Sequence, residues 1–345
     1  MISLSCVFVG ILPLCISPPA ERDADAPAMT LTSAGKLRWV GFSPDGKLLA
    51  TGGESLRVWD VSTGECLRKY PTVRFVNCVA FSPDGRTIVS AGGAPVGKIA
   101  EVTAEVRLWD VATGNLVREL SGPKLVSASV AFSPDGRLVA AASGTPPEVF
   151  VWQAATGAVV SRFAGHKQDV AAVAFSPDGR LVASSGAEQT VCLWNPVTGA
   201  EARLPAVHAR FVSALAFTPD GKTLVTAGFD GLVKLWNSGD HTHRANLAGI
   251  GKAVGNIAVS PDGAWVAASY LAGRGEIRIW SPVWGRQHAH LRPPGANVAC
   301  LAFSPDSRSL AAAAFDGTVR IWKTADLRAA ESPSLERTPE PRRLR

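Results

Sequence analysis

The chain has 345 residues, of which 46% are hydrophobic, and its formal net charge is +6. Such hydrophobic content is expected when sheets are covered on both faces by their neighbours, and it does not indicate a membrane protein. The basic residues are scattered and no basic run is interleaved with aromatic residues, so nucleic acid is an unfavoured partner. Without a Cys-x-x-Cys pair, the sequence predicts that Cys66, Cys78, Cys192 and Cys300 are small core residues rather than disulfide or zinc-ribbon cysteines.

The first 28 residues allow two interpretations. Residues 2–16 are apolar and precede a polar stretch, as in an export leader, although no Lys or Arg comes before them. The run is shorter than the about 20 apolar residues that span a membrane, and it contains Pro13. Alternatively, translation starts at Met29, where the repeats begin, and the segment is a misassigned start. The first interpretation predicts an exported protein and the second a cytoplasmic one.

From residue 29 onward the chain is a repeat array. The phrase Ser-Pro-Asp-Gly begins at Ser43, Ser82, Ser133, Ser176 and Ser260, with variants beginning at Thr218 and Ser304. A tryptophan follows each phrase, at Trp59, Trp109, Trp152, Trp194, Trp236, Trp280 and Trp322, at intervals of 50, 43, 42, 42, 44 and 42 residues. Repeats of this length with several short strands are typical of propeller blades.

One repeat shows the strands that we expect in all of them. In residues 204–239, apolar strands are predicted at 212–217, 223–227 and 232–236, and an outer fourth strand follows each tryptophan, as at 158–163. Thr218 to Gly221 forms the first turn, because proline presets its dihedral angle and glycine takes the left-handed conformation. Ser307 replaces that glycine in the last repeat, where we expect slight strain. The predicted fold is all-β: a seven-bladed β-propeller of four-stranded antiparallel blades.

The repeats resemble the WD-repeat β-propellers. Trp59-Asp60 and Trp109-Asp110 show the dipeptide that names this family, Trp194-Asn195 is a close variant, and Gly165-His166 matches the family's Gly-His pair. The resemblance covers residues 29 to 322, and we assign residues 29–330 to the propeller and 331–345 to a disordered tail. It also implies that Met29 to Ser33 closes the ring as the outer strand of the last blade; the alternative is that residues 327–330 complete that blade alone.

The resemblance further implies a buried hydrogen-bond network in two repeats. Its members are His208, Thr226, Asp230 and Trp236 in repeat five, and His166, Ser184, Glu188 and Trp194 in repeat four. An indole N–H only donates, so a hydroxyl or imidazole must accept from it, and a carboxylate orients the imidazole. We expect these residues to be structural, and we expect no catalytic set, metal or cofactor. Two His-x-His pairs, His241 with His243 and His288 with His290, are expected to be exposed on outer strands.

The resemblance also implies that partners dock where loops lead into the inner strands and where loops join the second strand to the third. Aromatic and arginine residues favour interfaces, and the candidates there are Arg74, Phe75, Arg210, Phe211, Phe229 and Phe315. Repeat two also has an insertion in this region, at residues 94–104, which is equally consistent with a functional loop and with neutral drift. Basic residues two places before the tryptophan, at Arg57, Arg107, Lys234, Arg278 and Arg320, are expected on a solvated strand face.

Taken together, these patterns favour a monomeric, non-enzymatic scaffold that binds one or more proteins. Two alternatives stay open: an exported propeller enzyme or small-ligand binder that uses the central channel, and a basic propeller that associates with nucleic acid. Abundant Ala, Arg, Gly and Pro with little Lys is typical of a GC-rich bacterial genome.

Overall fold

The computed structural model describes residues 26–72, 75–93, 104–123, 127–144, 146–204, 207–247, 249, 251–271, 275–283, 285–295 and 297–327. Several predictions therefore concern residues outside this part of the chain: most of the leader, Arg74, nearly all of the insertion in repeat two, and the tail. Within the described part, no helix is both long enough and apolar enough to cross a membrane.

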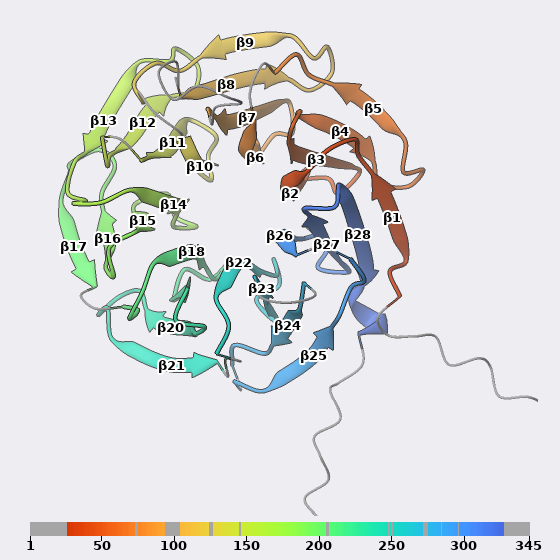
Figure 1. Cartoon of the computed structure of the whole chain (residues 1–345). Helices are drawn as coiled ribbons and strands as arrows, with labels where there is room; N and C mark the ends of the chain where they lie inside the picture. Colours follow the sequence, from red (N-terminus) through yellow and green to blue (C-terminus); the bar gives the residue numbers. More distant parts are fainter. Residues whose placement is uncertain are drawn as a thin grey trace, which may run out of the picture.

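The described strands form seven antiparallel four-stranded sheets arranged as blades around an axis (Figure 1), which confirms the predicted fold class. The first strand of each blade lies nearest the axis. These inner strands are β2 (Leu37–Phe42), β6 (Val76–Phe81), β10 (Ser127–Phe132), β14 (Val170–Phe175), β18 (Val212–Phe217), β22 (Val254–Val259) and β26 (Val298–Phe303). The second strands are β3 (Leu48–Gly53), β7 (Thr87–Gly92), β11 (Leu138–Ser143), β15 (Val182–Gly186), β19 (Thr223–Gly228), β23 (Val266–Tyr270) and β27 (Ser309–Ala314).

The third strands carry the repeat tryptophans. They are β4 (Arg57–Asp60), β8 (Glu105–Asp110), β12 (Val149–Gln153), β16 (Val191–Trp194), β20 (Val233–Asn237), β24 (Ile277–Trp280) and β28 (Thr318–Lys323). The outer strands are β5 (Cys66–Lys69), β9 (Leu116–Glu119), β13 (Val159–Phe163), β17 (Glu201–Leu204), β21 (His243–Leu247), β25 (Gln287–Leu291) and β1 (Met29–Thr32). A short 3-10 helix, η2 (Thr324–Asp326), follows the last strand.

The seventh blade combines strands from both ends of the described chain. Its sheet has the order β1-β28-β27-β26, and β1 pairs antiparallel with β28 so that Met29 lies opposite Ile321 and Thr32 opposite Thr318. Figure 1 shows β1 at the rim beside β28. The pairing gives β28 an outer neighbour, as the other third strands have.

Each turn between an inner and a second strand is held by a hydroxyl and an aspartate, with Thr218 supplying the hydroxyl in blade five and serine in the other blades. In blade one, the Ser43 hydroxyl donates to Asp45 Oδ1 at 2.6 Å and accepts from the Leu48 N–H at 2.9 Å. The Ser43 hydroxyl and the Lys47 N–H stabilise the carboxylate, which lowers the pKa of Asp45. Gly46 has a φ of 71°, and Ser307 adopts the same left-handed conformation at 59°, which costs energy for a residue with a Cβ.

The core lies between the blades rather than inside one of them. Leu37, Val40 and Leu49 of blade one, for example, pack in one cluster with Ala311 and Ile321 of blade seven. Every sheet is thus covered on both faces, which explains the high hydrophobic content of a chain built from short strands.

Candidate functional site

The buried polar network of blade five connects the four residues that the resemblance implied. His208 Nδ1–H donates to Asp230 Oδ1 at 2.9 Å, and His208 Nε2 lies 2.9 Å from Thr226 Oγ1. Trp236 Nε1–H donates to Thr226 Oγ1 at 3.0 Å, and the Ala209 N–H donates to Asp230 Oδ2 at 3.0 Å. Because the Asp230 carboxylate can only accept, the proton of the neutral imidazole lies on Nδ1. Nε2 therefore accepts from the Thr226 hydroxyl, which in turn accepts from the Trp236 indole.

The electrostatics of this network favour a neutral imidazole beside an ionised carboxylate. Burial lowers the pKa of His208 and outweighs the attraction of Asp230. Burial also acts to raise the pKa of Asp230, but hydrogen bonds from Ala209 and His208 prevail and hold that pKa below its usual value. The His208 side chain is 0% exposed, so it lacks the access to substrate that catalysis requires.

Blade four contains a related network with a longer carboxylate. His166 Nδ1 hydrogen-bonds Glu188 Oε1, and His166 Nε2 lies 2.7 Å from Ser184 Oγ. Trp194 Nε1–H donates to the same hydroxyl at 3.4 Å, so all four implied residues are again connected. Burial lowers the pKa of His166, whose side chain is also 0% exposed.

Other blades keep only part of this arrangement. Trp59 donates to Thr51 and Trp109 donates to Ser90, each at 2.9 Å. In blade six, the strand position that Thr226 occupies in blade five is taken by Ala268, which has no hydroxyl. Trp280 Nε1 is accordingly buried without a hydrogen-bond partner among the described residues. The indole therefore serves two purposes, packing in every blade and hydrogen bonding in some.

The aromatic candidates gather at the opposite end of the blades from the Ser-Pro-Asp turns. The Phe211 and Phe229 rings are 4.9 Å apart, and Phe229 is 38% exposed. Phe315 occupies the same position in blade seven and is 37% exposed. Phe75 is half-buried in the loop before β6, whereas Arg210 is exposed. Antiparallel connectivity brings these loops to one end of the propeller, as the sequence predicted for a docking surface.

Sequence reasoning missed one member of this surface, Arg38. It lies at the second residue of β2, next to a β-bulge, with its guanidinium 5.3 Å from the centre of the Phe75 ring. Its Nη1 donates to Asn77 Oδ1 at 2.8 Å. A cation stacked on an aromatic ring is a favourable contact, and here it joins blade one to blade two. No signal in the sequence indicated this contact, because Arg38 and Phe75 belong to different repeats.

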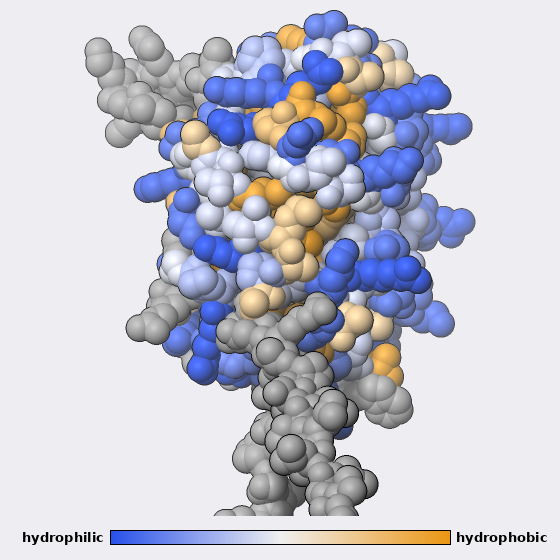
Figure 2. All heavy atoms as spheres, turned by 90° about the vertical axis from the view of Figure 1, so that its right-hand side faces the viewer, coloured by the Kyte–Doolittle hydropathy of each residue, from blue (hydrophilic) through white to orange (hydrophobic). Residues whose placement is uncertain are grey.

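Grooves between blades open at the other end. One has a volume of about 580 Å³ and is lined by Leu48, Val58, Leu67, Val111 and residues of two turns. An equivalent groove of about 520 Å³ between blades two and three contains Val117. Figure 2 shows the rim on the side of β1 and β5, where apolar side chains form patches among hydrophilic ones. Neighbouring apolar residues on the outer strands, such as Leu116 and Val117, are the sequence signal for the apolar patches on the rim of the propeller.

Three predictions about burial were wrong. Cys66 was expected in the core but is exposed on the outer strand β5, unlike the buried Cys78, Cys192 and Cys300. The basic residues before the tryptophans are not on a solvated face; they are half-buried or buried, and several are paired, as Arg107 is with Glu105 at 3.1 Å and Arg320 with Asp316 at 3.0 Å. His288 and His290 are half-buried rather than exposed: His288 stacks on Trp265 and His290 pairs with Glu276. The apolar stems of the arginine and lysine side chains pack favourably, and acidic neighbours offset the cost of burying a positive charge.

Fold, repeat turns and indole network together define a WD-repeat propeller, and the family comparisons agree. A model described as IFT122 first beta-propeller matches residues 126–339, which is more than half of the chain. A model of the WD domain, G-beta repeat, matches residues 27–60 and 64–95. The chain therefore belongs to the family of WD-repeat β-propellers.

Individual relatives share only part of their length with this chain. Telomerase protein component 1 of Mus musculus is 34% identical over 101 residues, which are 29% of this chain and 4% of that protein. Anaphase-promoting complex subunit cdc20 of Dictyostelium discoideum is 32% identical over 113 residues, or 31% of this chain and 20% of that protein. Eukaryotic translation initiation factor 3 subunit I of Emericella nidulans is 36% identical over 70 residues, 20% of this chain and 21% of that protein.

Proposed function

We propose that this propeller is a non-catalytic platform for protein association and that partners dock on the end that carries Phe75, Phe211, Phe229 and Phe315. The observation that carries the proposal is the exposure of Phe229 and Phe315, more than a third of each side chain, at equivalent positions of blades five and seven. Aromatic residues and arginine are enriched at protein interfaces, and Arg38 and Arg210 accompany these rings.

Support also comes from what the relatives are called. Their names describe a protein component of telomerase and subunits of the anaphase-promoting complex and of a translation initiation factor, so each is named as one part of a larger whole. The rigidity of the fold suits such a task, because loops on a fixed scaffold can present a surface without reorganising.

The geometry argues against catalysis by the two histidine networks. Both imidazoles are enclosed, and each is engaged at both nitrogens by a carboxylate and a hydroxyl. A general base must come within hydrogen-bond reach of a substrate proton, and neither nitrogen is available for that. We therefore assign these networks to the stability of blades four and five.

The test is affinity capture of the tagged full-length protein at native expression, followed by mass spectrometry. Wild type is compared with a Phe229→Ala, Phe315→Ala double variant and with Val197→Ala, which removes an exposed apolar side chain, 72% accessible, at the other end of the propeller. We expect a defined set of proteins that Val197→Ala retains and the double variant loses, since each interface anchor contributes about tenfold or more to affinity.

Other outcomes redirect the assignment. The same set retained by the double variant would refute the proposed face. If neither sample retains a specific protein, the proposal fails and the channel alternative gains weight. Binding of nucleic acid that weakens steeply as salt is raised would instead support the basic-propeller alternative.

A further inference from the structure

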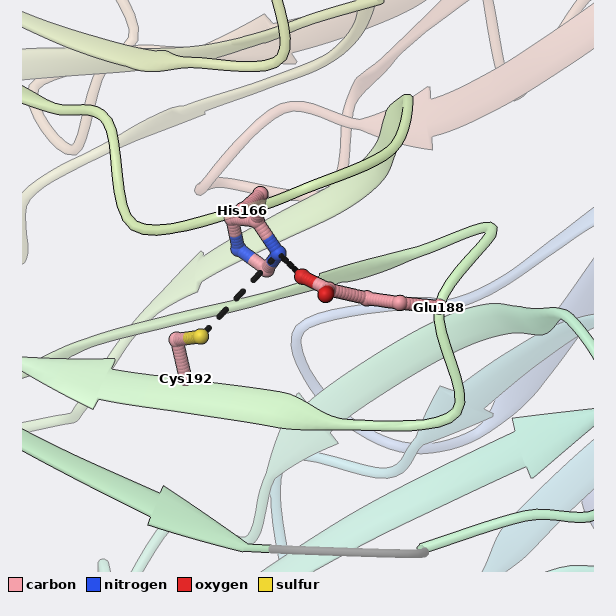
Figure 3. A group of neighbouring side chains, drawn as sticks. All are labelled: His166, Glu188 and Cys192. Carbon is pink, nitrogen blue, oxygen red and sulfur yellow. Dashed lines mark hydrogen bonds and ion pairs between the residues drawn. The ribbon is translucent and has the colours of Figure 1, made fainter.

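A cysteine lies beside the histidine–carboxylate pair of blade four. Cys192, on β16, has its Sγ 4.0 Å from His166 Nδ1, and Figure 3 shows the thiol and the Glu188 carboxylate approaching the same ring. One ligand atom from each of the three residues lies within 4.8 Å of the other two. Imidazole, thiolate and carboxylate are the ligands that Zn²⁺ takes in proteins. We propose that His166, Glu188 and Cys192 form a zinc-binding site.

The surroundings of His166 already orient it for a metal. Histidines that bind zinc commonly donate their second ring N–H to a fixed acceptor. His166 Nε2 lies 2.7 Å from Ser184 Oγ, and Trp194 holds that hydroxyl from the other side. When Nδ1 binds the ion, Nε2 carries the imidazole proton and donates a hydrogen bond to Ser184 Oγ, so the ring keeps its position while its tautomer changes.

The charges of the three ligands balance the ion. Glu188 and the Cys192 thiolate each supply one negative charge and the imidazole is neutral, which makes the complex with Zn²⁺ neutral and suits a buried position. Burial raises the pKa of the free Cys192 thiol to about 12, so the thiol is protonated in the absence of an ion. Zinc binding therefore replaces and releases the thiol proton, as at other thiolate sites.

Blade five provides an internal contrast, since its network is the same but its metal ligands are incomplete. Asp230 replaces Glu188, and Lys234 stands at the strand position of Cys192, where its positive charge opposes a cation near His208. In blade four the nearby positive charge is Arg203, which is paired with Glu201. The remaining blades have large side chains at this position, namely Arg57, Arg107, Phe150, Arg278 and Arg320. Cys192 thus departs from a pattern that elsewhere places bulk or positive charge against the second strand.

The experiment measures metal in the full-length protein. Protein purified without chelators is analysed for zinc by inductively coupled plasma mass spectrometry, and metal-depleted protein is titrated with Co²⁺ to detect the thiolate-to-cobalt absorption band. The variant is Cys192→Ser; the matched control is Cys78→Ser, a buried cysteine whose Sγ contacts the Val130 backbone. We expect a single zinc per chain and the cobalt band in wild type and in Cys78→Ser. Cys192→Ser should lose the band and bind zinc about tenfold or more weakly.

A second variant separates ligand loss from misfolding. Glu188→Gln keeps a hydrogen-bonding oxygen for His166 but removes one ligand charge, so it should fold and bind zinc more weakly than wild type. Circular dichroism of the metal-depleted proteins verifies folding. Wild type that retains no zinc and shows no cobalt band would overturn the proposal, as would a Cys192→Ser protein that binds both ions as wild type does. Neither readout depends on a protein partner.

Discussion

Replacing His208 by alanine should destabilise the propeller markedly. The substitution removes one hydrogen bond to an ionised carboxylate, at 2.9 Å, and one to the Thr226 hydroxyl, at 2.9 Å. Such bonds contribute about 1.5–3 and about 0.5–1.5 kcal/mol respectively. Asp230 keeps the backbone N–H groups of Ala209 and Leu232, which reduces the loss. We therefore expect the free energy of unfolding to fall by about 2–3 kcal/mol.

The imidazole also leaves a space that nothing fills. Its ring lies against Gly228, only 2.8 Å from where a Cβ would stand, and glycine has no side chain that could move into the gap. For a propeller of about 300 residues, the expected loss of stability corresponds to a lowering of the thermal midpoint by roughly 3–5 °C.

Thermal unfolding followed by circular dichroism measures this effect at neutral pH. Arg210→Ala serves as the control, because Arg210 is exposed in the same loop and its loss should change stability by less than about 0.5 kcal/mol. A double-mutant cycle with Asp230→Ala then isolates the pair. An unchanged midpoint for His208→Ala would refute the network as a source of stability, and additive effects in the cycle would refute the coupling between imidazole and carboxylate.

Three further predictions follow from the same contacts. Burial lowers the folded-state pKa of His166 and His208, so their contribution to stability is complete above the unfolded pKa of about 6.5 and is lost as pH falls below it. The urea midpoint should therefore be lower at about pH 5.5 than at about pH 7.5, which lie roughly one pH unit below and above that pKa. Equal midpoints at the two pH values would contradict this prediction. Trp236→Phe should lower the free energy of unfolding by about 1 kcal/mol more than Trp280→Phe does in the same assay. Of these two indoles, only that of Trp236 has a hydrogen-bond acceptor among the described residues. Equal losses of stability would count against this prediction. Gly221→Ala should cost about 1–2 kcal/mol, since the φ there is 68° while the new Cβ meets only Pro177 at 3.7 Å; a neutral result would show that the turn relaxes.

Part of the site was predictable from the resemblance to the WD-repeat propellers. That resemblance implied a network of His208, Thr226, Asp230 and Trp236, and the structure connects all four. The aromatic loop residues could be assigned to one end of the blades for the same reason. The contact of Arg38 with Phe75 could not, because it joins two repeats whose packing the sequence does not state.

The sequence by itself determined the number of blades and the order of their strands, since turn chemistry and apolar alternation are local and repeat seven times. Only the tertiary structure decided which side chains meet between blades and between strands. It placed the half-buried Arg107 beside Glu105, left Trp280 without an acceptor among the described residues, and brought Cys192 to His166 across 26 residues of sequence. The physical reason is that burial and contact depend on how neighbouring sheets pack, which a single repeat does not specify.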